Sequence, residues 1–215
     1  DKKLDYNPIE KYLKCADLKQ VGFSEQAIAE FMGEKKSQIV KWLKILDYME
    51  KYLEQFDYTG IYTRLEKTEG PFVDLTGYIE GYKSGKAGTA IWGYDETDIA
   101  DLTKVSFDYI RARYEGKEFR EIAKTGKGGS IFSHEHLWRD FLDNHEKIVP
   151  EDSKTTDEIR EAHPNEDLSK LLEVRDAEWR KKAHGQFEGN LRRYTQKLND
   201  IRDSVKPREL LERAL

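Results

Sequence analysis

The chain contains few of the residues that cross-link or interrupt a fold. Its 215 residues include one cysteine, Cys15, and five prolines. A single cysteine excludes an intramolecular disulfide and a cysteine-built zinc site, a pattern typical of intracellular proteins. There is no run of about 18 uncharged apolar residues, and the opening DKKLDYNPIE lacks the apolar region of a signal peptide. We therefore expect a cytoplasmic protein that is not inserted in a membrane.

Charge is plentiful, but an overall basic excess is missing. Charged residues make up 37% of the chain and the formal net charge is −5. A protein of this charge is not expected to coat nucleic acid nonspecifically, so any contact with a polyanion must be local. Residues 34–44 hold four lysines and one glutamate, a local charge of +3, whereas residues 47–80 hold eight acids and three bases, a local charge of −5.

Helix signals are clearest near the N-terminus. Apolar residues recur at spacings of three and four and strict alternation is scarce, which predicts an all-α protein. Asn7 is expected to cap a helix that has Pro8 at its first position and Gly22 as its stop. Ser24 is expected to cap a second helix, which ends near Met32–Gly33.

A third helix is predicted from about Lys36 through the segment ILDYMEKYLEQF. Its apolar stripe consists of Ile45, Tyr48, Met49, Tyr52, Leu53 and Phe56. A helix-turn-helix needs a small residue where its helices cross, a glycine in the turn, and bulky anchors on the second helix. Ala29, Gly33, Ile39 and Trp42 stand at these positions, and Ile28 and Met32 fill the facing side. The segment from Ser24 onward is thus predicted to be a helix-turn-helix.

This register also predicts which residues of the third helix face outward. They are Lys35, Lys36, Ser37, Gln38 and Lys41. Lysine binds guanine or phosphate, glutamine reads adenine through its amide, and serine contacts a base or the backbone. Lys44, further along the helix, is expected to meet a phosphate. The alternative is that these lysines form an ordinary solvated helix face.

The segment NPIEKYLKCADLKQVGFSEQAIAEFMGEKKSQIVKWLKIL resembles ParB/Spo0J-like proteins, in which a helix begun by Asn-Pro leads into a helix-turn-helix. The matching positions are Gly22, Ser24, Ile28, Ala29, Met32, Gly33, Ile39, Leu43, Ile45 and Leu46. The resemblance covers about 40 of the 215 residues. It implies binding of double-stranded DNA at a specific site by a homodimer, in plasmid or chromosome partition or in transcriptional regulation.

The resemblance also implies a ParB-type nucleotide-binding domain before Asp1, and the start without methionine is expected of a piece of a longer polypeptide. The arginine-rich phosphate motif of that domain is not found in this chain. CTP use is therefore not carried over to this chain. No cofactor and no metal are expected, and no spacing of nucleophile, base and orienting acid predicts catalytic activity. The competing hypothesis is a helical protein-interaction scaffold in which the helix-turn-helix is purely structural.

The rest of the chain gives weaker signals. Glycines 60, 70, 77, 81, 85, 88 and 93 predict short, broken helical pieces, and a helix is expected at 97–114, closed by Gly116. Ser133 is expected to cap the helix HEHLWRDFLDNH. Residues 151–167, with seven acids and two bases, predict an acidic linker. The predicted domains are accordingly 1–57 (helix-turn-helix), 58–150 (helical middle) and 151–215 (linker and long C-terminal helix).

The last helix carries a long apolar stripe that needs a partner surface. Its members are Leu172, Trp179, Ala183, Phe187, Leu191, Tyr194, Leu198, Ile201 and Val205. Packing within the chain and pairing with a second chain both remain open. Gly185 and Gly189 lie within this helix and predict either a bend or a close helix crossing. A basic patch, RKKAH with Arg192 and Arg193, either supports DNA phosphates or forms a solvated face.

Two further patterns were weighed for chemistry. His134, His136 and Asp140 lie close in sequence, and the last two share a helical face, which suggests a metal-dependent nuclease as a third hypothesis. The favoured interpretation is a surface helix. KTGKGGS is not a phosphate-binding loop, because Glu121 and Gly128 stand where that motif needs a glycine and a hydroxyl residue, although its Lys124 and Lys127 are able to touch a phosphate.

Overall fold

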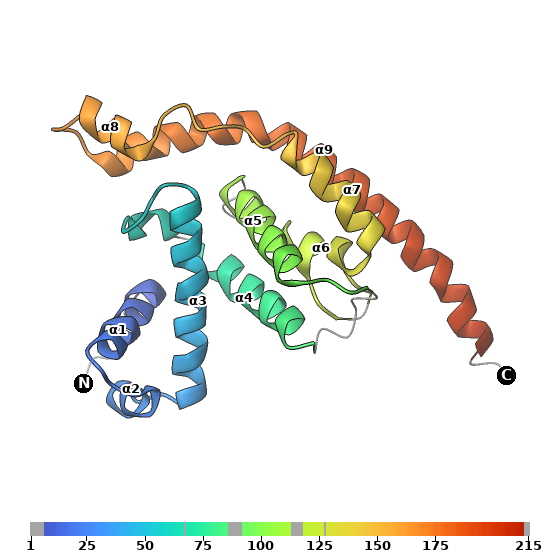
Figure 1. Cartoon of the computed structure of the whole chain (residues 1–215), viewed down its shortest axis with the longest axis horizontal. Helices are drawn as coiled ribbons and strands as arrows, with labels where there is room; N and C mark the ends of the chain where they lie inside the picture. The colour runs from blue at the N-terminus through green and yellow to red at the C-terminus, as the bar shows by residue number, and fades with distance from the viewer. Residues whose placement is uncertain (1–6, 67, 86–91, 113–117, 127, 213–215) are drawn as a thin grey trace. The chain divides into compact units, whose positions relative to one another are not determined.

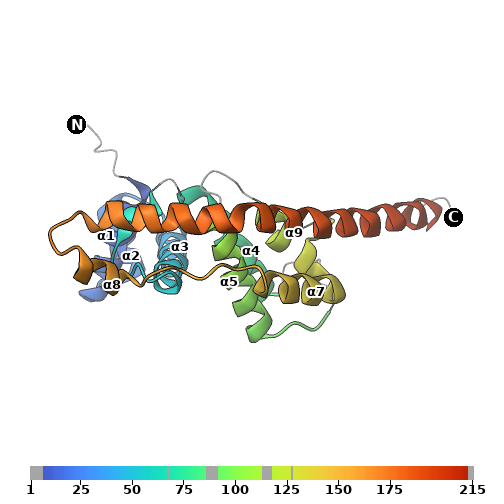
Figure 2. The same ribbon diagram turned by 90° about the horizontal axis from the view of Figure 1, so that it is seen from above.

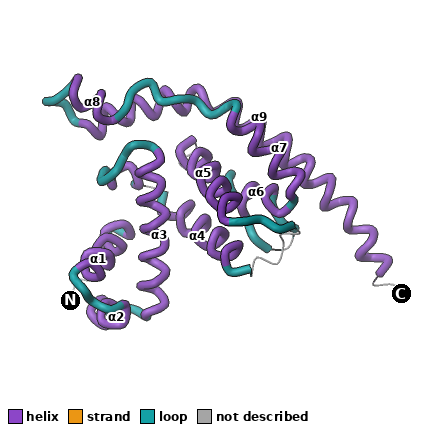
Figure 3. The backbone as a smooth tube through the Cα atoms, viewed as in Figure 1, coloured by secondary structure: helices purple, strands orange, loops and turns teal. Residues whose placement is uncertain are grey.

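The computed structural model of the chain is all-α, as the apolar spacing predicts. It describes residues 7–66, 68–85, 92–112, 118–126 and 128–212. Within these ranges the chain forms nine α-helices and two 3-10 helices, with no strand (Figure 1, Figure 3). It divides into two compact units, residues 1–76 and 77–215, which are described separately below.

The first unit is built on three helices whose ends follow the predicted signals. They are α1 (Pro8–Gln20), α2 (Glu25–Met32) and α3 (Lys36–Gln55). The Asn7 side chain accepts a hydrogen bond from the backbone N–H two residues later, at 3.2 Å. The Ser24 hydroxyl accepts one from the N–H three residues later, also at 3.2 Å. Both predicted caps are thus confirmed.

The core of the first unit lies along one side of α3. All six residues of the predicted stripe are buried, as are Ile28 and Ile39. The ring of Trp42 packs on Tyr12 of α1, with centroids 5.9 Å apart. These contacts join α1 and α2 to the first half of α3 and hold the outer surface of that half in a fixed position.

The glycine-rich region after α3 is more regular than the sequence predicts. A 3-10 helix, η1 (Tyr62–Leu65), is followed by α4 (Glu69–Lys83). Gly70, Gly77 and Gly81 lie inside α4, so the prediction of short broken pieces is wrong here. The reason is tertiary: the apolar residues of α4 are fully or almost fully buried and outweigh the poor helix propensity of glycine. They are Phe72, Leu75, Ile79 and Tyr82. Gly88 lies outside the described residues.

The second unit continues with α5 (Glu96–Ala112) and α6 (Arg120–Ala123). The start of α5 matches the predicted helix to one residue, whereas Gly116, its predicted stop, lies outside the described residues. The 3-10 helix η2 (Ile131–Ser133) precedes α7 (Glu135–Glu146). The predicted cap of α7 is wrong, because the Ser133 hydroxyl accepts from the backbone N–H of Ser130 at 2.9 Å and residue 134 occupies the cap position.

The acidic segment after α7 is not an open linker, contrary to the prediction. It contains α8 (Thr156–Ala162), which begins with a capping box between Thr155 and Glu158. Arg175, in the helix that follows, donates to the carbonyl oxygen of Lys154 at 3.0 Å. The indole N–H of Trp179 donates to the carbonyl oxygen of Pro150, just before the segment, at 2.7 Å. The segment is therefore fastened to the helix that follows it.

The last helix, α9 (Leu168–Glu212), is 45 residues long (Figure 2). Most of its predicted stripe is buried against α5, α7 and α8, which confirms packing within the chain. Leu191 and Ile201 are half-buried, and the side chain of Val205 lies outside the described part. Figure 1 shows α9 curving along its length. A Cβ placed on Gly185 or Gly189 would meet nothing within 4 Å, so neither glycine marks a close crossing among the described residues.

None of the helices in the described ranges combines the length and the apolar character that a membrane-spanning segment requires.

Candidate nucleic-acid interface

The turn between α2 and α3 has the geometry that a helix-turn-helix requires. Gly33 adopts the left-handed conformation, with φ 68° and ψ 32°. The N–H of Glu34 donates to the carbonyl oxygen of Ala29 at 2.9 Å, which closes the end of α2. Ala29 of α2 and Ile39 of α3 are both buried, and the two helices pack on each other. The turn therefore fixes the direction in which α3 leaves α2.

The start of α3 differs from the starts of α1 and α2 because no side chain caps it. Lys35 occupies the cap position, and the first turn contains no acidic residue. The first N–H groups of a helix lack partners within the helix and carry a partial positive charge. An uncapped start next to lysines is suited to an anion such as a phosphate. A lysine at a cap position is the sequence signal for this feature, which the helix-turn-helix pattern alone does not predict.

The predicted outward residues gather on the first three turns of α3. Lys35, Lys36, Ser37 and Lys41 are exposed, as is Lys44, and Gln38 is half-buried at the edge of the core. Ser37, Lys41 and Lys44 follow a spacing of four and three, so they share one side of the helix. Within the described part of the chain, Lys35, Lys36 and Lys41 make no ion pair, whereas Lys44 has an interaction partner.

One acidic side chain close to this surface is already engaged. Glu25, at the start of α2, pairs with Lys19. The Lys19 ammonium, with a smaller contribution from Lys36, holds the pKa of Glu25 below its usual range. Glu25 therefore stays ionised but does not neutralise Lys36 through a direct ion pair.

The candidate metal ligands do not come together. No group of three or more metal-ligating side chains is found in the described ranges. Asp140 instead accepts a hydrogen bond from Lys197 at 2.9 Å. Burial, with a smaller contribution from Arg202, lowers the pKa of His134 and favours its neutral form. Within the described ranges, His134, His136 and Asp140 therefore form no shared metal site.

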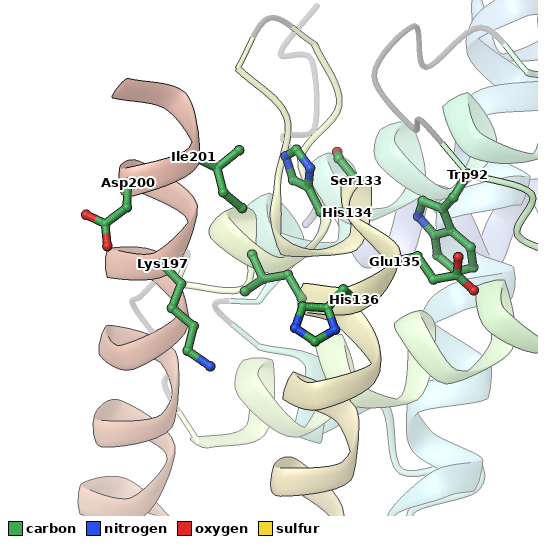
Figure 4. Close-up of a pocket in the computed structure, with 9 residues that line it drawn as sticks. Trp92, Ser133, His134, Glu135, His136, Lys197, Asp200 and Ile201 are labelled. Atoms are coloured by element: carbon green, nitrogen blue, oxygen red, sulfur yellow. The ribbon is translucent and has the colours of Figure 1, made fainter. Parts of the chain in front are cut away.

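The two histidines line a groove between the start of α7 and α9 (Figure 4). The groove has a volume of about 550 Å³, and Trp92 and Ile201 form part of its wall. Figure 4 shows the imidazoles of His134 and His136 apart from one another, with the Asp200 carboxylate directed away from both. The groove is broad and shallow, and its side chains do not converge on one point.

The glycine-rich loop at 124–130 is fastened to α9 by its carbonyl groups. Arg202 donates to the carbonyl oxygens of Gly128 and Gly129, at 2.7 and 2.8 Å. Lys124 pairs with Glu121 at 2.6 Å. Lys127 lies outside the described residues. The described contacts therefore give this loop a structural role and do not form a phosphate cradle.

Comparison of the chain with protein-family models, with curated proteins and with solved structures finds no match. The resemblance to ParB/Spo0J-like proteins therefore rests on the residues of segment 7–46 alone. The start of α3 is the site where the uncapped helix end, the exposed polar side chains and the unpaired lysines coincide.

Proposed function

We propose that the chain binds double-stranded DNA through its helix-turn-helix, with α3 as the helix that enters the major groove. The observation that carries this proposal is the set of three exposed lysines near the uncapped start of α3, Lys35, Lys36 and Lys41, which make no ion pair within the described part of the chain. A rigid turn presents them on a helix, which is the element that the major groove admits.

Each outward residue then has a role that follows from its chemistry. Lys36, Ser37, Gln38 and Lys41 enter the major groove, where lysine binds guanine or a phosphate and the glutamine amide recognises adenine. Lys35, together with Lys44, contacts phosphates and sets the orientation of the helix. The resemblance of segment 7–46 supports a role of this binding in partition or in transcriptional regulation.

A homodimer completes the proposal on energetic grounds. A module with few cationic contacts binds weakly at physiological salt, because each phosphate contact contributes only part of the affinity. Two copies on two half-sites combine their contacts and give specificity through the spacing of the half-sites. The acidic remainder of the chain repels DNA and so limits docking to defined faces.

The test is fluorescence anisotropy of the full chain with random duplex DNA over a salt series. The Lys36→Ala/Lys41→Ala variant is expected to bind at least about tenfold more weakly, and its slope of log affinity against log salt is expected to fall by about 2. The matched control is Lys51→Ala/Lys147→Ala, which removes two exposed lysines that are paired on their own helices. An equal loss in the control would assign the effect to net charge and overturn the proposal.

The second candidate, a protein-interaction scaffold, is favoured by apolar side chains exposed on the first unit. Val21 and Phe31 are 71% and 69% exposed, and Phe23 is 47% exposed. Large exposed apolar residues often mark binding surfaces. No DNA binding at low salt by the folded chain, combined with weaker partner capture by Phe31→Ser, would favour this candidate over DNA binding.

A further inference from the structure

A second basic surface lies on α9, in the other unit of the chain. Residues 181–193 hold four cations and one acid, Glu188, which gives a local charge of +3 and equals that of residues 34–44. The cations are Lys181, Lys182, Arg192 and Arg193, and all are exposed. The chain as a whole carries −5, so this stretch opposes the overall charge.

The four cations form two rows along α9. Positions eleven apart in an α-helix are offset by only about 20°, because eleven residues make close to three turns. Lys181 and Arg192 therefore form one row, and Lys182 and Arg193 form a second row about 100° round the helix. Each row spans about 16 Å along the axis at a rise of 1.5 Å per residue. The buried stripe of α9 lies on the other side of the helix.

The cations are available for a partner. Lys181, Lys182 and Arg193 make no ion pair within the described part of the chain. Arg192 pairs with Glu188 at 3.5 Å, but its side chain is 80% exposed, and such surface pairs are worth little. Three charges at least are therefore free to exchange their counterions for phosphates.

The helix surface between the two rows carries no bulky side chain. By the same helical geometry Gly185 and Gly189 lie between the rows, and both are exposed. A Cβ added at either position would meet nothing within 4 Å, so packing in the fold does not require glycine there. Each glycine costs the helix about 1 kcal/mol relative to alanine. The space they leave allows the backbone of a ligand to approach the helix closely.

We infer that this outer face of α9 is a second surface for duplex DNA, which contacts phosphates without reading bases. The inference rests on the proposed function, because it takes the same ligand. Charge complementarity commits it to a polyanion, and two rows along a helix fit a regular array of phosphates. Such contacts add affinity that is independent of sequence and strongly dependent on salt.

The test adds the variant Lys181→Gln/Lys182→Gln/Arg193→Gln to the anisotropy series with duplex DNA. We expect its salt slope to fall by about 2 to 3, and its affinity at 0.1 M salt to fall more than about tenfold on every duplex sequence. The matched control is Lys51→Gln/Lys147→Gln/Arg160→Gln, which removes three exposed, paired cations elsewhere. Glutamine retains good helix propensity, and circular dichroism verifies the fold of each variant.

The outcomes separate the two proposals. If the α9 variant binds like its control while Lys36→Ala/Lys41→Ala loses binding, the α9 surface is overturned and the helix-turn-helix stands. If the α9 variant loses binding while Lys36→Ala/Lys41→Ala does not, the α9 surface stands and the helix-turn-helix role fails. Equal losses in the α9 variant and its control, or tighter binding of single strands than of duplex by the unaltered chain, would also overturn the α9 surface.

Discussion

The two units differ in where their charged side chains lie. In the first, the core along α3 is mainly apolar and aromatic, with Arg64 of η1 as its buried charged residue, 7% exposed and 5.4 Å from the ring centre of Tyr58. Lys35, Lys36 and Lys41 face solvent and make no ion pair within the described residues. In the second, charged side chains are built into the core: Arg111 of α5 is 3% exposed and Asp176 of α9 is 2% exposed. The comparison suggests that apolar and aromatic packing contributes most to the first unit, whereas paired buried charges help fix the position of α9 in the second.

The buried pairs of the second unit are well formed. Arg111 donates to Asp176 at 2.7 and 3.2 Å and to Asp152 at 2.6 and 3.0 Å. Its guanidinium lies 4.3 Å from the ring centre of Trp179. Separately, His145 of α7 approaches Asp108 of α5 at 2.9 Å. The planar contacts of Arg111 with the two aspartates satisfy the hydrogen-bond donors of a buried guanidinium. Loss of either partner would leave the other as an unpaired buried charge.

Removing the central charge of this cluster should have the largest effect. Arg111→Met leaves Asp176 buried without its cation, and breaking such a pair costs about 3–5 kcal/mol of the free energy of unfolding. Denaturant unfolding measures the loss, and hydrogen exchange should locate it in α5 and α9. The control Arg160→Met removes an exposed arginine paired with Asp157 and should cost less than about 1 kcal/mol. A loss below about 1 kcal/mol for Arg111→Met as well would contradict the structural role of the cluster.

The matching change in the first unit is Ile39→Ala. Ile39 is fully buried between α2 and α3, and truncation of such a side chain costs about 2–4 kcal/mol. The loss should be confined to the first unit. If Arg111→Met destabilised the first unit equally, the two units would not be independent, and the comparison would fail.

Cys15 provides a probe for this prediction, because it is the only cysteine in the chain and is buried in the first unit. Burial, with a smaller contribution from Glu34, raises the pKa of Cys15 to about 11, which disfavours the reactive thiolate. Labelling of the thiol at pH 8 should therefore be slow until the unit opens. Ile39→Ala should accelerate labelling by about 30-fold or more, at 1.4 kcal/mol per factor of ten, whereas Arg111→Met should leave it within about twofold.

The comparison also explains what the sequence predicts and what it does not. The caps at Asn7 and Ser24 and the turn at Gly33 depend on neighbours within a few residues, so local patterns suffice to predict them. The pair Arg111–Asp176 joins positions 65 residues apart, and no spacing rule reveals it.

The two wrong predictions in the middle of the chain have similar causes. Gly70, Gly77 and Gly81 were interpreted as breaks because propensity was judged without the packing that holds α4 together. Ser133 was assigned as a cap because the competing partner, Ser130, does not stand out in the sequence. The outward face of α3 is predictable from helical register, but whether Lys35, Lys36 and Lys41 form ion pairs depends on tertiary neighbours, and within the described residues they form none.

A smaller effect is expected from the turn of the first unit. Gly33 has a positive φ of 68°, and a Cβ there would meet nothing within 4 Å, so Gly33→Ala introduces backbone strain without a clash. The expected cost is about 1–2 kcal/mol. Gly33→Asn should cost less, because asparagine tolerates this conformation. Cys15 labelling measures both, and equal losses for the two variants would argue against strain as the cause.

The smallest expected effects concern the exposed glycines of α9. Here the direction of the change in stability and in DNA affinity is more informative than its size. Gly185→Ala and Gly189→Ala should each raise the free energy of unfolding by about 0.5–1 kcal/mol, because alanine is the better helix former and the added methyl meets nothing. If the α9 face binds DNA, the same methyl groups should hold the phosphates away from the helix. The affinity for DNA should then fall by about twofold to fivefold, which corresponds to about 0.4–1 kcal/mol of binding free energy. A variant that is more stable to unfolding but binds DNA more weakly would show that glycine at these positions serves DNA binding. Higher stability with unchanged affinity would make this face an ordinary solvated one and leave α3 as the single DNA surface.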